Sequence, residues 1–502
     1  MHPRALVDIT AELLQQFRRH TAPADRALQK FLKEKGFLGS HDRKFVSEAF
    51  YYTLRHVIRF DEALRQSFEN APYTEWISPS LGFPAGNPEG LACWQSPPVE
   101  EKRGPYGSAK VGLPLDQWVD SLRVALAADE LAPDDPDQPP FFGFVEETFH
   151  RDWTLNESWH QGEWVVRLIN RTRENVSRLK NQPKRNSPNS SEFQYSTPQW
   201  LYATLAYGLK QNENDDFFRS LLESAPVSLR VNTLKTSRDE YIQLLQEKAP
   251  QLDFQESELV PDGILFSRRV ANGQLPGERE GLVEFQDEGS QLISTLVGIK
   301  PGALVLDVCA GGGGKSLHLA ALMKNKGTIL MHDKVPRRLT NGLARCAAAG
   351  ATIARPLEPN YLADGLSGQP NLKTLYKKAD LVLIDAPCSG LGTLRRSPEI
   401  KLRLSPIQLG KTIKTQQELL SYYAQAVRPG GVLAYVTCSL LREENEDATD
   451  RFLKANPEFH RRVFQEAELP DPSMLSRFGD LRLYPHRHNT DGFYLARLER
   501  KG

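Results

Sequence analysis

The amino-acid sequence predicts an α/β protein in which an all-helical N-terminal domain and a small α+β domain precede a domain built on a mostly parallel sheet. Three observations support this fold class. Apolar residues recur at helical spacing over residues 1–70, a strand-like alternation is found at 227–232, and from residue 290 short apolar strands alternate with helices. Strands without polar positions are typical of a sheet that is buried on both faces.

The N-terminal domain is expected to be a small helical bundle over residues 1–70. Its apolar positions form two helical faces on either side of the polar segment 39–42: Leu6, Ile9, Leu13 and Phe17, then Val46, Phe50, Leu54 and Ile58. Residues 71–190 are rich in proline, glycine and acidic residues but keep several aromatic residues. We therefore expect a Pro/acid-rich insertion or linker there that is partly ordered.

Two further domains are expected, a small α+β domain at 195–280 and the sheet domain at 281–502. The elements expected around the small domain are helices at 201–209 and 237–246 and strand-like runs at 227–232, 264–266 and 283–285. The sheet domain is expected to contain strands at 304–308, 328–331, 381–384 and 432–436, with helices at 315–323, 336–349 and 405–427. The last helix opens with Ser405-Pro406-Ile407-Gln408, a capping box with proline at the first helical position.

The composition limits the kinds of binding site and the cellular location that we expect for this protein. Lys+Arg and Asp+Glu both number 63 in 502 residues, so the formal net charge is zero and any nucleic acid must be bound through local patches. The five cysteines form no CxxC pair, which argues against a disulfide framework and a zinc site. We expect free thiols, no metal and a reducing, cytoplasmic location. The sequence shows no apolar run long enough to span a membrane and no signal-peptide core.

A glycine-rich loop follows the first strand of the sheet domain and opens a helix. Its residues are Cys309, Ala310, Gly311, Gly312, Gly313, Gly314, Lys315 and Ser316. Glycines let a ligand approach the backbone closely, and a helix N-terminus favours polar or anionic groups. Asp333 ends the next strand, where an acid can hydrogen-bond the two hydroxyls of a ribose. We therefore expect an adenosine-containing ligand, with Arg338 also among the residues that bind it.

Three ligands, and a turn without any ligand, compete as explanations of this loop. A triphosphate-binding P-loop requires glycine at position 309, which is cysteine, and a dinucleotide fingerprint requires glycine at 316, which is serine. S-adenosylmethionine needs neither a triphosphate cradle nor a pyrophosphate turn. The glycines alone are also compatible with a tight strand–helix turn that binds no ligand. The presence of Asp333 makes this explanation less favoured.

Two cysteine motifs end two other strands of the same predicted sheet. The first contains Asp385, Pro387 and Cys388, and the second contains Cys438, followed by the acidic run 443–446. The carboxyl ends of parallel strands share one edge, which is where open α/β sheets bind their ligands. One such cysteine is ordinary as a small buried hydrophobe. Two thiols beside an acid and a glycine-rich loop favour a functional site.

These motifs resemble the RNA cytosine-5 methyltransferases of the RsmB/NOP type. The family's cofactor loop reads Cys-Ala-Ala-Pro-Gly-Gly-Lys-Thr, whereas this chain has Gly311 and Gly312 in place of Ala and Pro. Residues 385–390 and 437–439 match the family's two cysteine motifs as written, and residues 491–494 are similar to its closing strand. The resemblance covers 281–502 and implies a Rossmann-like class I methyltransferase domain that binds S-adenosyl-L-methionine.

The N-terminal half resembles the family more loosely. Residues 42–48 with 54–55 are similar to a NusB-type helical domain, which implies RNA binding by residues 1–70. Residues 196–201 and 229–233 are similar to the small domain that precedes the catalytic one. Asn360 and Asp364 are two positions that could stand for the family's mid-sheet acid, which contacts the adenine side of the cofactor.

The resemblance also assigns roles in methyl transfer to carbon 5 of a cytosine. A thiolate that adds at carbon 6 makes carbon 5 nucleophilic, and this role is implied for Cys438. Cys388 is implied to assist release, Asp385 to hydrogen-bond the base, and Lys315 to support the site electrostatically. Lys315 and Asp385 are also expected among the cofactor-binding residues.

The expected substrate is RNA, most of all ribosomal RNA, in a single-stranded or loop form, because the target base must be unstacked. Two basic clusters are expected to contact phosphates, with a solvated surface as the alternative for each. Their members are Arg395, Arg396, Lys401, Arg403, Lys411 and Lys414, and then Arg167, Arg171, Arg173, Arg178, Lys180, Lys184 and Arg185.

Two other functions stay open at the level of sequence. A DNA cytosine-5 methyltransferase would use Cys388 as its nucleophile, and the Thr437-Cys438 motif and the N-terminal helical domain argue against it. A non-catalytic RNA-binding or assembly factor could retain the cofactor fold. The presence of both thiols and of Asp385 argues against this second alternative.

Overall fold

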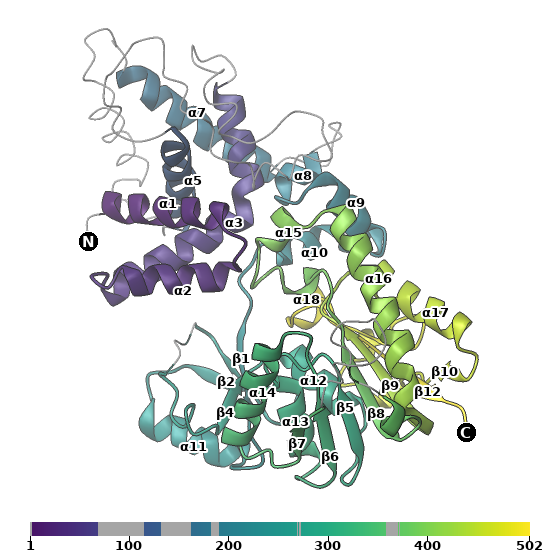
Figure 1. Cartoon of the computed structure of the whole chain (residues 1–502). Coiled ribbons are helices and arrows are strands. Elements are labelled where there is room, and N and C mark those ends of the chain that lie inside the picture. The colour runs from purple at the N-terminus through teal and green to yellow at the C-terminus, as the bar shows by residue number, and fades with distance from the viewer. Residues whose placement is uncertain are drawn as a thin grey trace. The chain divides into compact units, whose positions relative to one another are not determined.

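The computed structural model describes residues 3–68, 115–131, 162–181, 190–268, 270, 273–357, 370 and 372–502 (Figure 1). These residues fall into two compact units, Met1–Leu222 with Ser397–Ser405 and Glu223–Arg396 with Pro406–Gly502. The predictions for Asn360 and Asp364 lie outside the described residues. Among the helices that are described, none combines the length and the apolar character that crossing a membrane requires.

The first unit is helical, as the sequence predicts for its N-terminal part. Both apolar faces predicted for residues 1–70 are buried in one core, with Ile9 packed at its edge. The helices of this unit are α1 (Pro3–Arg19), α2 (Ala24–Glu34), α3 (Ser40–Phe68), α5 (Leu115–Leu131), α7 (Gly162–Asn181), α8 (Ser190–Gln194), α9 (Gln199–Ala206), α10 (Asn214–Ser220) and α15 (Ile400–Arg403).

Helices α5 and α7 come from the stretch that the sequence analysis treats as an insertion, yet they pack into the same core. Leu122 of α5 and Leu179 of α7 are buried with the apolar residues of α1 and α3. The buried guanidinium of Arg123 lies 2.5 Å from Asp61 of α3 and 2.6 Å from Asp120 of α5. Because buried charges need such partners, this network fixes the register of α5 against α3.

Residues 397–405 belong to the helical unit although they lie in the C-terminal half of the sequence. Leu402 joins the helical core, and Glu399 accepts a hydrogen bond at 3.0 Å from the backbone N–H that begins α2. Lys401 Nζ donates to the Arg55 carbonyl at 2.6 Å, and Arg403 donates to backbone carbonyls between α1 and α2. The predicted phosphate contact is wrong for Lys401, because its side chain is enclosed by the helices.

The second unit opens with a small antiparallel sheet of strand order β2-β3-β1-β4. Its elements are β1 (Val227–Val231), α11 (Arg238–Lys248), β2 (Phe254–Glu256), β3 (Gly263–Phe266) and β4 (Val283–Phe285). Ser237 and Glu240 form a capping box at the start of α11, which explains why the helix begins there. The sheet includes β4, beyond the expected domain end at 280, while α9 and α10 cluster with the helical unit.

A larger sheet of strand order β10-β12-β9-β8-β5-β6-β7 forms the rest of the unit, with β11 paired to β12. Strands β7, β6, β5, β8 and β9 run parallel, and β12 is antiparallel to β9. The elements are α12 (Glu288–Leu296), β5 (Leu304–Asp307), α13 (Gly314–Leu322), β6 (Thr328–Met331), α14 (Pro336–Ala348), β7 (Ala354–Pro356), β8 (Ala379–Asp385), α16 (Pro406–Tyr423), β9 (Val427–Thr437), α17 (Glu446–Ala455), β10 (Phe459–Arg461), β11 (Leu481–Arg482), α18 (Pro485–His488) and β12 (Tyr494–Arg500).

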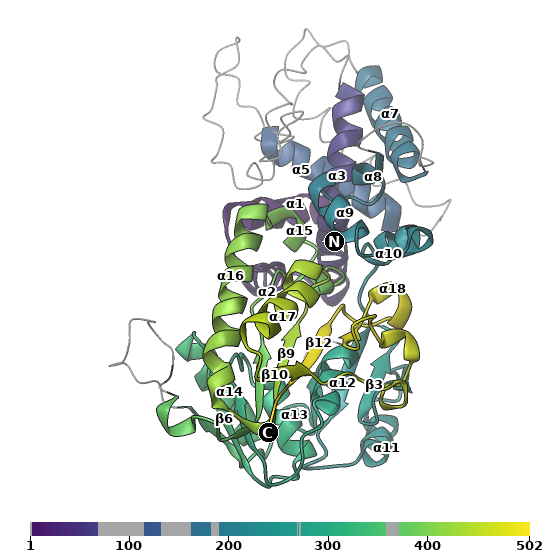
Figure 2. The ribbon, with the colours of Figure 1, turned by 90° about the vertical axis from the view of Figure 1, so that its right-hand side faces the viewer.

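Both faces of this sheet are covered, which explains the uninterrupted apolar strands. Val305 and Leu383 pack with α12, α13 and α14, whereas Leu306 and Val382 pack with α16 and α17 on the opposite face. Figure 2 shows α16 beside α17 next to β9. The predicted fold class, a Rossmann-like α/β domain after a small α+β sheet and a helical region, is confirmed.

The strand order reverses at β5. The chain leaves β5 towards β6 and β7 and then returns to β8 on the other side of β5. Ligands of doubly wound sheets bind at this reversal, at the carboxyl edge. The glycine-rich loop follows β5 and Asp385 ends β8, so the fold places both predicted motifs at that point.

Asn232 ties the small sheet to the larger one, and its removal tests that connection. The buried amide Nδ2 donates to the carbonyls of Gly281 and Ala349, both at 2.8 Å. We expect Asn232→Ala to lower the free energy of unfolding by about 2 kcal/mol, because two buried carbonyls lose their donor. Denaturant titration measures the change in the free energy of unfolding. The exposed Asn341→Ala serves as control and should change stability by less than about 0.5 kcal/mol; equal effects of both would contradict the assignment.

Candidate functional site

The glycine-rich loop between β5 and α13 has one packed side and one open side. Gly313 has a φ of +78°, and a Cβ there would lie 2.9 Å from the Gly342 carbonyl oxygen of α14. A Cβ on Gly342 would in turn lie 3.0 Å from the Gly311 carbonyl oxygen. This close approach requires residues without side chains. On the other side, a Cβ on Gly314 would meet no atom within 4 Å.

Asp333 follows β6 and holds this loop through backbone amides. Its Oδ2 accepts a hydrogen bond from Gly311 N at 2.9 Å, and its Oδ1 accepts one from Val335 N at 2.8 Å. Each carboxylate oxygen can accept a second hydrogen bond, so ligand binding is compatible with these contacts. Arg338 lies on the first turn of α14 with its side chain exposed. Ala310 is anchored by its N–H, which donates to the His332 carbonyl at 2.9 Å.

Two cysteines near the loop have packing roles. Burial raises the pKa of Cys309 well above its ordinary value, and burial raises the pKa of Cys346 to about 11. The Cys346 thiol contacts the carbonyl oxygen of Gly313 at 3.7 Å from α14. Both thiols therefore stay protonated at neutral pH, which distinguishes them from a nucleophile.

Asp385 and Lys315 form an ion pair between β8 and α13. The Lys315 Nζ lies 2.7 Å from Asp385 Oδ2, and the two side chains are 11% and 33% exposed. Burial disfavours the ammonium, but the Asp385 carboxylate outweighs this and raises the pKa of Lys315. Lys315 is thus a fixed positive charge at the end of the sheet. The partial exposure of Asp385 leaves its carboxylate accessible to a ligand.

Cys388 and Cys438 are brought together, with their Sγ atoms 3.3 Å apart. Asp385 and Val436 are partners in the parallel pairing of β8 and β9, so the residues that follow both strands reach the same edge. The hydrogen bond to Cys438, together with burial, raises the pKa of Cys388 well above its ordinary value. Cys388 therefore keeps its proton at neutral pH.

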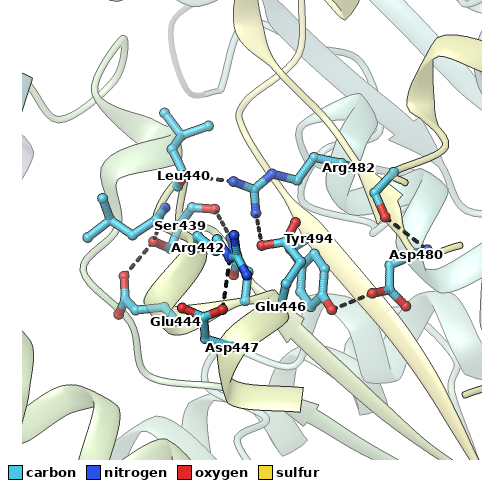
Figure 3. A network of polar contacts seen from close by, with 12 residues as sticks. Ser439, Leu440, Arg442, Glu444, Glu446, Asp447, Asp480, Arg482 and Tyr494 are labelled. Carbon is cyan, nitrogen blue, oxygen red and sulfur yellow. Dashed lines mark hydrogen bonds and ion pairs between the residues drawn. The ribbon is translucent and has the colours of Figure 1, made fainter. Parts of the chain in front are cut away.

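A buried carboxylate, Glu444, joins the loops of the two cysteines, and the sequence analysis did not assign it a role. It accepts hydrogen bonds from the backbone N–H of Ser389 at 2.9 Å and from the hydroxyl of Ser439. Figure 3 shows the contact with Ser439. The acidic run 443–446 is visible in the sequence, but spacing alone does not show which of its carboxylates turns inward.

Gly392 is a second site residue that the sequence analysis missed. Its N–H donates to the Cys438 carbonyl, and its carbonyl accepts from the Gly492 N–H, both at 2.8 Å. A Cβ on Gly392 would lie 1.9 Å from the Gly492 carbonyl oxygen. The chain after Cys388, the chain after Cys438 and the segment before β12 therefore meet at one backbone junction.

The basic cluster after Cys388 serves mainly internal contacts, which corrects the predicted phosphate role. Arg395 is 4% exposed and donates to Asn489 and to the Ser224 carbonyl. Arg396 pairs with Asp491 at 2.7 Å and with Asp287 at 2.8 Å. Both guanidinium groups are therefore engaged in hydrogen bonds or ion pairs with side-chain and backbone oxygens of the loops. Among the described side chains of the two clusters, those of Lys411 and Lys414 on α16 and of Arg171, Arg178 and Lys180 on α7 are exposed. The predictions for Arg167, Arg173, Lys184 and Arg185 concern side chains that lie outside the described part of the chain.

The residues at the strand reversal fit an adenosine-containing cofactor. The open side of the loop offers space where a Cβ would stand at Gly314, the start of α13 offers unpaired N–H groups, and Asp333 offers carboxylate lone pairs. Within the described residues, no group of three or more His, Cys, Asp or Glu side chains is arranged to hold a metal ion. The fold and this site define an S-adenosyl-L-methionine-dependent methyltransferase.

Comparison with known proteins identifies the family. The model of the 16S rRNA methyltransferase RsmB/F family matches residues 294–499, and that of the RsmF/B-like ferredoxin-like domain matches 197–271. The chain belongs to this RsmB/F family of methyltransferases. The family resemblance and the cofactor predicted from the sequence are thereby confirmed.

Individual relatives agree with this family. The chain is 33% identical over 308 residues to the probable ribosomal RNA small subunit methyltransferase B of Synechocystis sp., covering 61% of this chain and 67% of that one. It is 30% identical over 341 residues to ribosomal RNA small subunit methyltransferase B of Shewanella oneidensis, covering 67% and 74%. The crystal structure of PH0851 superposes with a TM-score of 0.70 at 26% identity, covering 100% of this chain and 99% of that one.

The junction at Gly392 can be tested by adding one carbon atom. We expect Gly392→Ala to lower methyltransferase turnover by about 100-fold, because the chain segments that meet at the junction must separate. Affinity for S-adenosyl-L-methionine, measured by calorimetry, should be unchanged. Gly410→Ala is the matched control, since a Cβ there meets no atom within 4 Å. Full activity of Gly392→Ala would refute the role of this junction.

Proposed function

We propose that this protein transfers a methyl group from S-adenosyl-L-methionine to carbon 5 of a cytosine in RNA, through a covalent cysteine adduct. The observation that carries the proposal is the pair of thiols 3.3 Å apart beside the Lys315–Asp385 ion pair. A methyltransferase that acts on oxygen or on an exocyclic nitrogen has no need of two adjacent thiols. The names of the relatives, ribosomal RNA small subunit methyltransferase B, support ribosomal RNA as the substrate.

Cys438 is the proposed nucleophile. Its thiolate adds to carbon 6 of the cytosine, and the displaced electron pair makes carbon 5 able to attack a methyl group. The bound cofactor supplies that methyl group on a sulfonium. The positive charge of Lys315 interacts electrostatically with Cys438. Asp385 is proposed to hydrogen-bond N3 and the exocyclic amine of the base, where charge develops.

Cys388 is proposed to assist release. After methylation the carbon 5 proton leaves to solvent, the bond between Sγ and carbon 6 breaks, and its electron pair returns to Cys438. Cys388 keeps its proton and lies 3.3 Å from the departing sulfur, so it can stabilise the thiolate by hydrogen bonding. The proposed division of labour follows the family resemblance of the two cysteine motifs, and the raised pKa of Cys388 supports its part in release.

The cofactor and RNA contacts complete the proposal. The loop 309–315 would hold the methionine end of the cofactor and Asp333 the ribose, with Arg338 and Asp385 contributing to the same site. The helical region is proposed to bind RNA, and the target cytosine is expected in a single-stranded or loop segment. The domain limits given in the sequence analysis stay proposals, modified by the packing of α5 and α7 into the helical core.

Substitution of each thiol tests the division of roles. Cys438→Ala should abolish methylation and leave no covalent RNA complex, because no thiolate is left to attack. Cys388→Ala should still attack and methylate but stall before elimination, so that an RNA adduct survives denaturing gel electrophoresis. Cys346→Ala, which changes a packing thiol of the same domain, should retain both steps. An adduct in Cys438→Ala with none in Cys388→Ala would support the DNA-type mechanism instead.

Substitution of Asp333 tests the cofactor site. We expect Asp333→Ala to weaken S-adenosyl-L-methionine binding by about 1–3 kcal/mol, since a charged hydrogen-bond acceptor is lost. Titration calorimetry measures the change, and the neighbouring exposed Lys334→Ala provides the control. Unchanged affinity in Asp333→Ala would reject the assignment.

The substrate class can be tested by bisulfite sequencing. Total RNA from cells with and without the protein should differ at a cytosine of ribosomal RNA, because 5-methylcytosine resists conversion. Purified enzyme should leave duplex DNA unmethylated, since the target base is paired and stacked there. Methylation of duplex DNA at a rate equal to that of ribosomal RNA would overturn the proposal.

A further inference from the structure

We propose that Glu444 is a positioning residue that clamps the loops of Cys388 and Cys438 together and so sets the distance between the two reacting thiols. The proposal rests on the roles proposed above for the two cysteines. Glu444 is fully buried at the end of the turn Arg442–Glu444, which follows β9 and precedes α17. Its side-chain hydrogen bonds within the described part of the chain go to Ser389, Ser439 and Gln416, so it acts through the residues beside the two cysteines.

The first arm of the clamp reaches the Cys388 loop. The backbone N–H of Ser389 donates to Glu444 Oε1 at 2.9 Å, and the Ser389 hydroxyl donates to Oε2 at 2.5 Å. Gln416 of α16 donates to Oε1 at 3.0 Å and also to the Pro387 carbonyl at 3.0 Å. The residues on both sides of Cys388 are therefore tied, directly or through Gln416, to one carboxylate.

The second arm reaches the Cys438 loop. The hydroxyl of Ser439 donates to Glu444 Oε2, the same oxygen that Ser389 uses, and the two serine hydroxyls lie 3.1 Å apart. Asn445 continues the contact, because its Nδ2 donates to the Ser439 carbonyl at 2.9 Å. One carboxylate thus accepts hydrogen bonds from the residue that follows each catalytic cysteine.

A second layer of charged residues holds the chain that carries the clamp. Arg482 of β11 donates to the Leu440 carbonyl at 2.7 Å and lies 3.3 Å from Glu446 at the start of α17. Arg442 pairs with Asp447 at 2.8 Å. Figure 3 shows these contacts around the turn that brings Glu444 back to Ser439. The turn is therefore fixed on both sides of Glu444.

The energetics favour a positioning role over simple packing. A buried carboxylate is costly unless hydrogen bonds satisfy it, and an apolar residue would fill the same space at lower cost. All four donors to Glu444 described above come from segments that flank Cys388 and Cys438 or from the helix that holds Pro387. The negative charge also helps to raise the pKa of Cys388, after its hydrogen bond with Cys438 and its burial. The clamp thus favours the protonated Cys388 that the release step uses.

Thiol cross-linking tests the clamp without RNA or cofactor. Diamide removes one hydrogen from each of two adjacent thiols and becomes a hydrazine, and mass spectrometry of digested protein quantifies the Cys388–Cys438 disulfide. We expect Glu444→Ala to form this disulfide at least about tenfold more slowly than the wild type, because thiols that point apart cannot be bridged. Glu443→Gln, which neutralises the adjacent half-buried carboxylate, should cross-link at the wild-type rate. Equal rates in Glu444→Ala and the wild type would overturn the proposal.

Kinetics separate positioning from general structural damage. Glu444→Ala should lower kcat by about 100-fold, with KM for RNA and the affinity for S-adenosyl-L-methionine unchanged. Glu444→Gln, which keeps the length and one carbonyl oxygen, should restore part of kcat. A parallel rise in KM, or loss of cofactor binding with no change in cross-linking, would show a merely structural residue.

Two further variants keep the test decisive if Glu444→Ala does not fold. Ser389→Ala and Ser439→Ala each remove one arm, and each should slow cross-linking, the double variant most of all. The proposed function is judged by the Cys438→Ala adduct experiment, which does not involve Glu444. If the Glu444 variants cross-link at the wild-type rate while the cysteine variants form adducts as expected, the clamp is wrong and the proposed function stands. If the Glu444 variants cross-link slowly while the adducts do not form as expected, the proposed function is wrong and the structural role of Glu444 stands.

Discussion

The parallel pairing of β8 with β9 is the constraint on which the site depends. Asp385 and Val436 are paired, so the residues two and three positions further along, Cys438 and Cys388, leave the sheet at the same edge. A one-residue slip would exchange the faces of an entire strand, and the buried apolar residues on both faces of the sheet oppose it. The hydrophobic core thus fixes the strand register that brings the two cysteines to the same edge of the sheet.

Close backbone contact is the second requirement at this edge. The loop after β5 packs on Gly342 of α14, and the loop after β8 packs on the segment before β12 through Gly392 and Gly492. At each of these places a Cβ would overlap a backbone atom of the neighbouring segment. The loops after β5 and β8 can approach their neighbours this closely because glycine removes the side chains that would separate them.

The sequence predicted the sheet domain well because its strands are short, wholly apolar and separated by glycine or proline, so pattern and structure coincide at β5, β6, β8 and β9. It also predicted that Lys315, Asp385, Cys388 and Cys438 lie at one edge, because the carboxyl ends of parallel strands share one edge of a sheet. It could not show that α5 and α7 complete the helical core, because their contacts with α1 and α3 are long-range. Glu444 was missed because the sequence of an acidic run does not show which of its carboxylates points into the protein and which points to solvent.

Most of the basic side chains that follow Cys388 in the sequence have internal partners, and this limits which of them can contact RNA. Arg395 and Arg396 are bound by loop oxygens, and Lys401 lies inside the helical unit. Among the described residues that follow Cys388, few basic side chains are therefore available to phosphates, in keeping with a chain of zero net charge. Under the proposed function, much of the selectivity would come from capture of the extruded cytosine through Asp385 and the two thiols. Such a site would favour RNA segments in which the cytosine is already unpaired, because less energy is spent on unstacking.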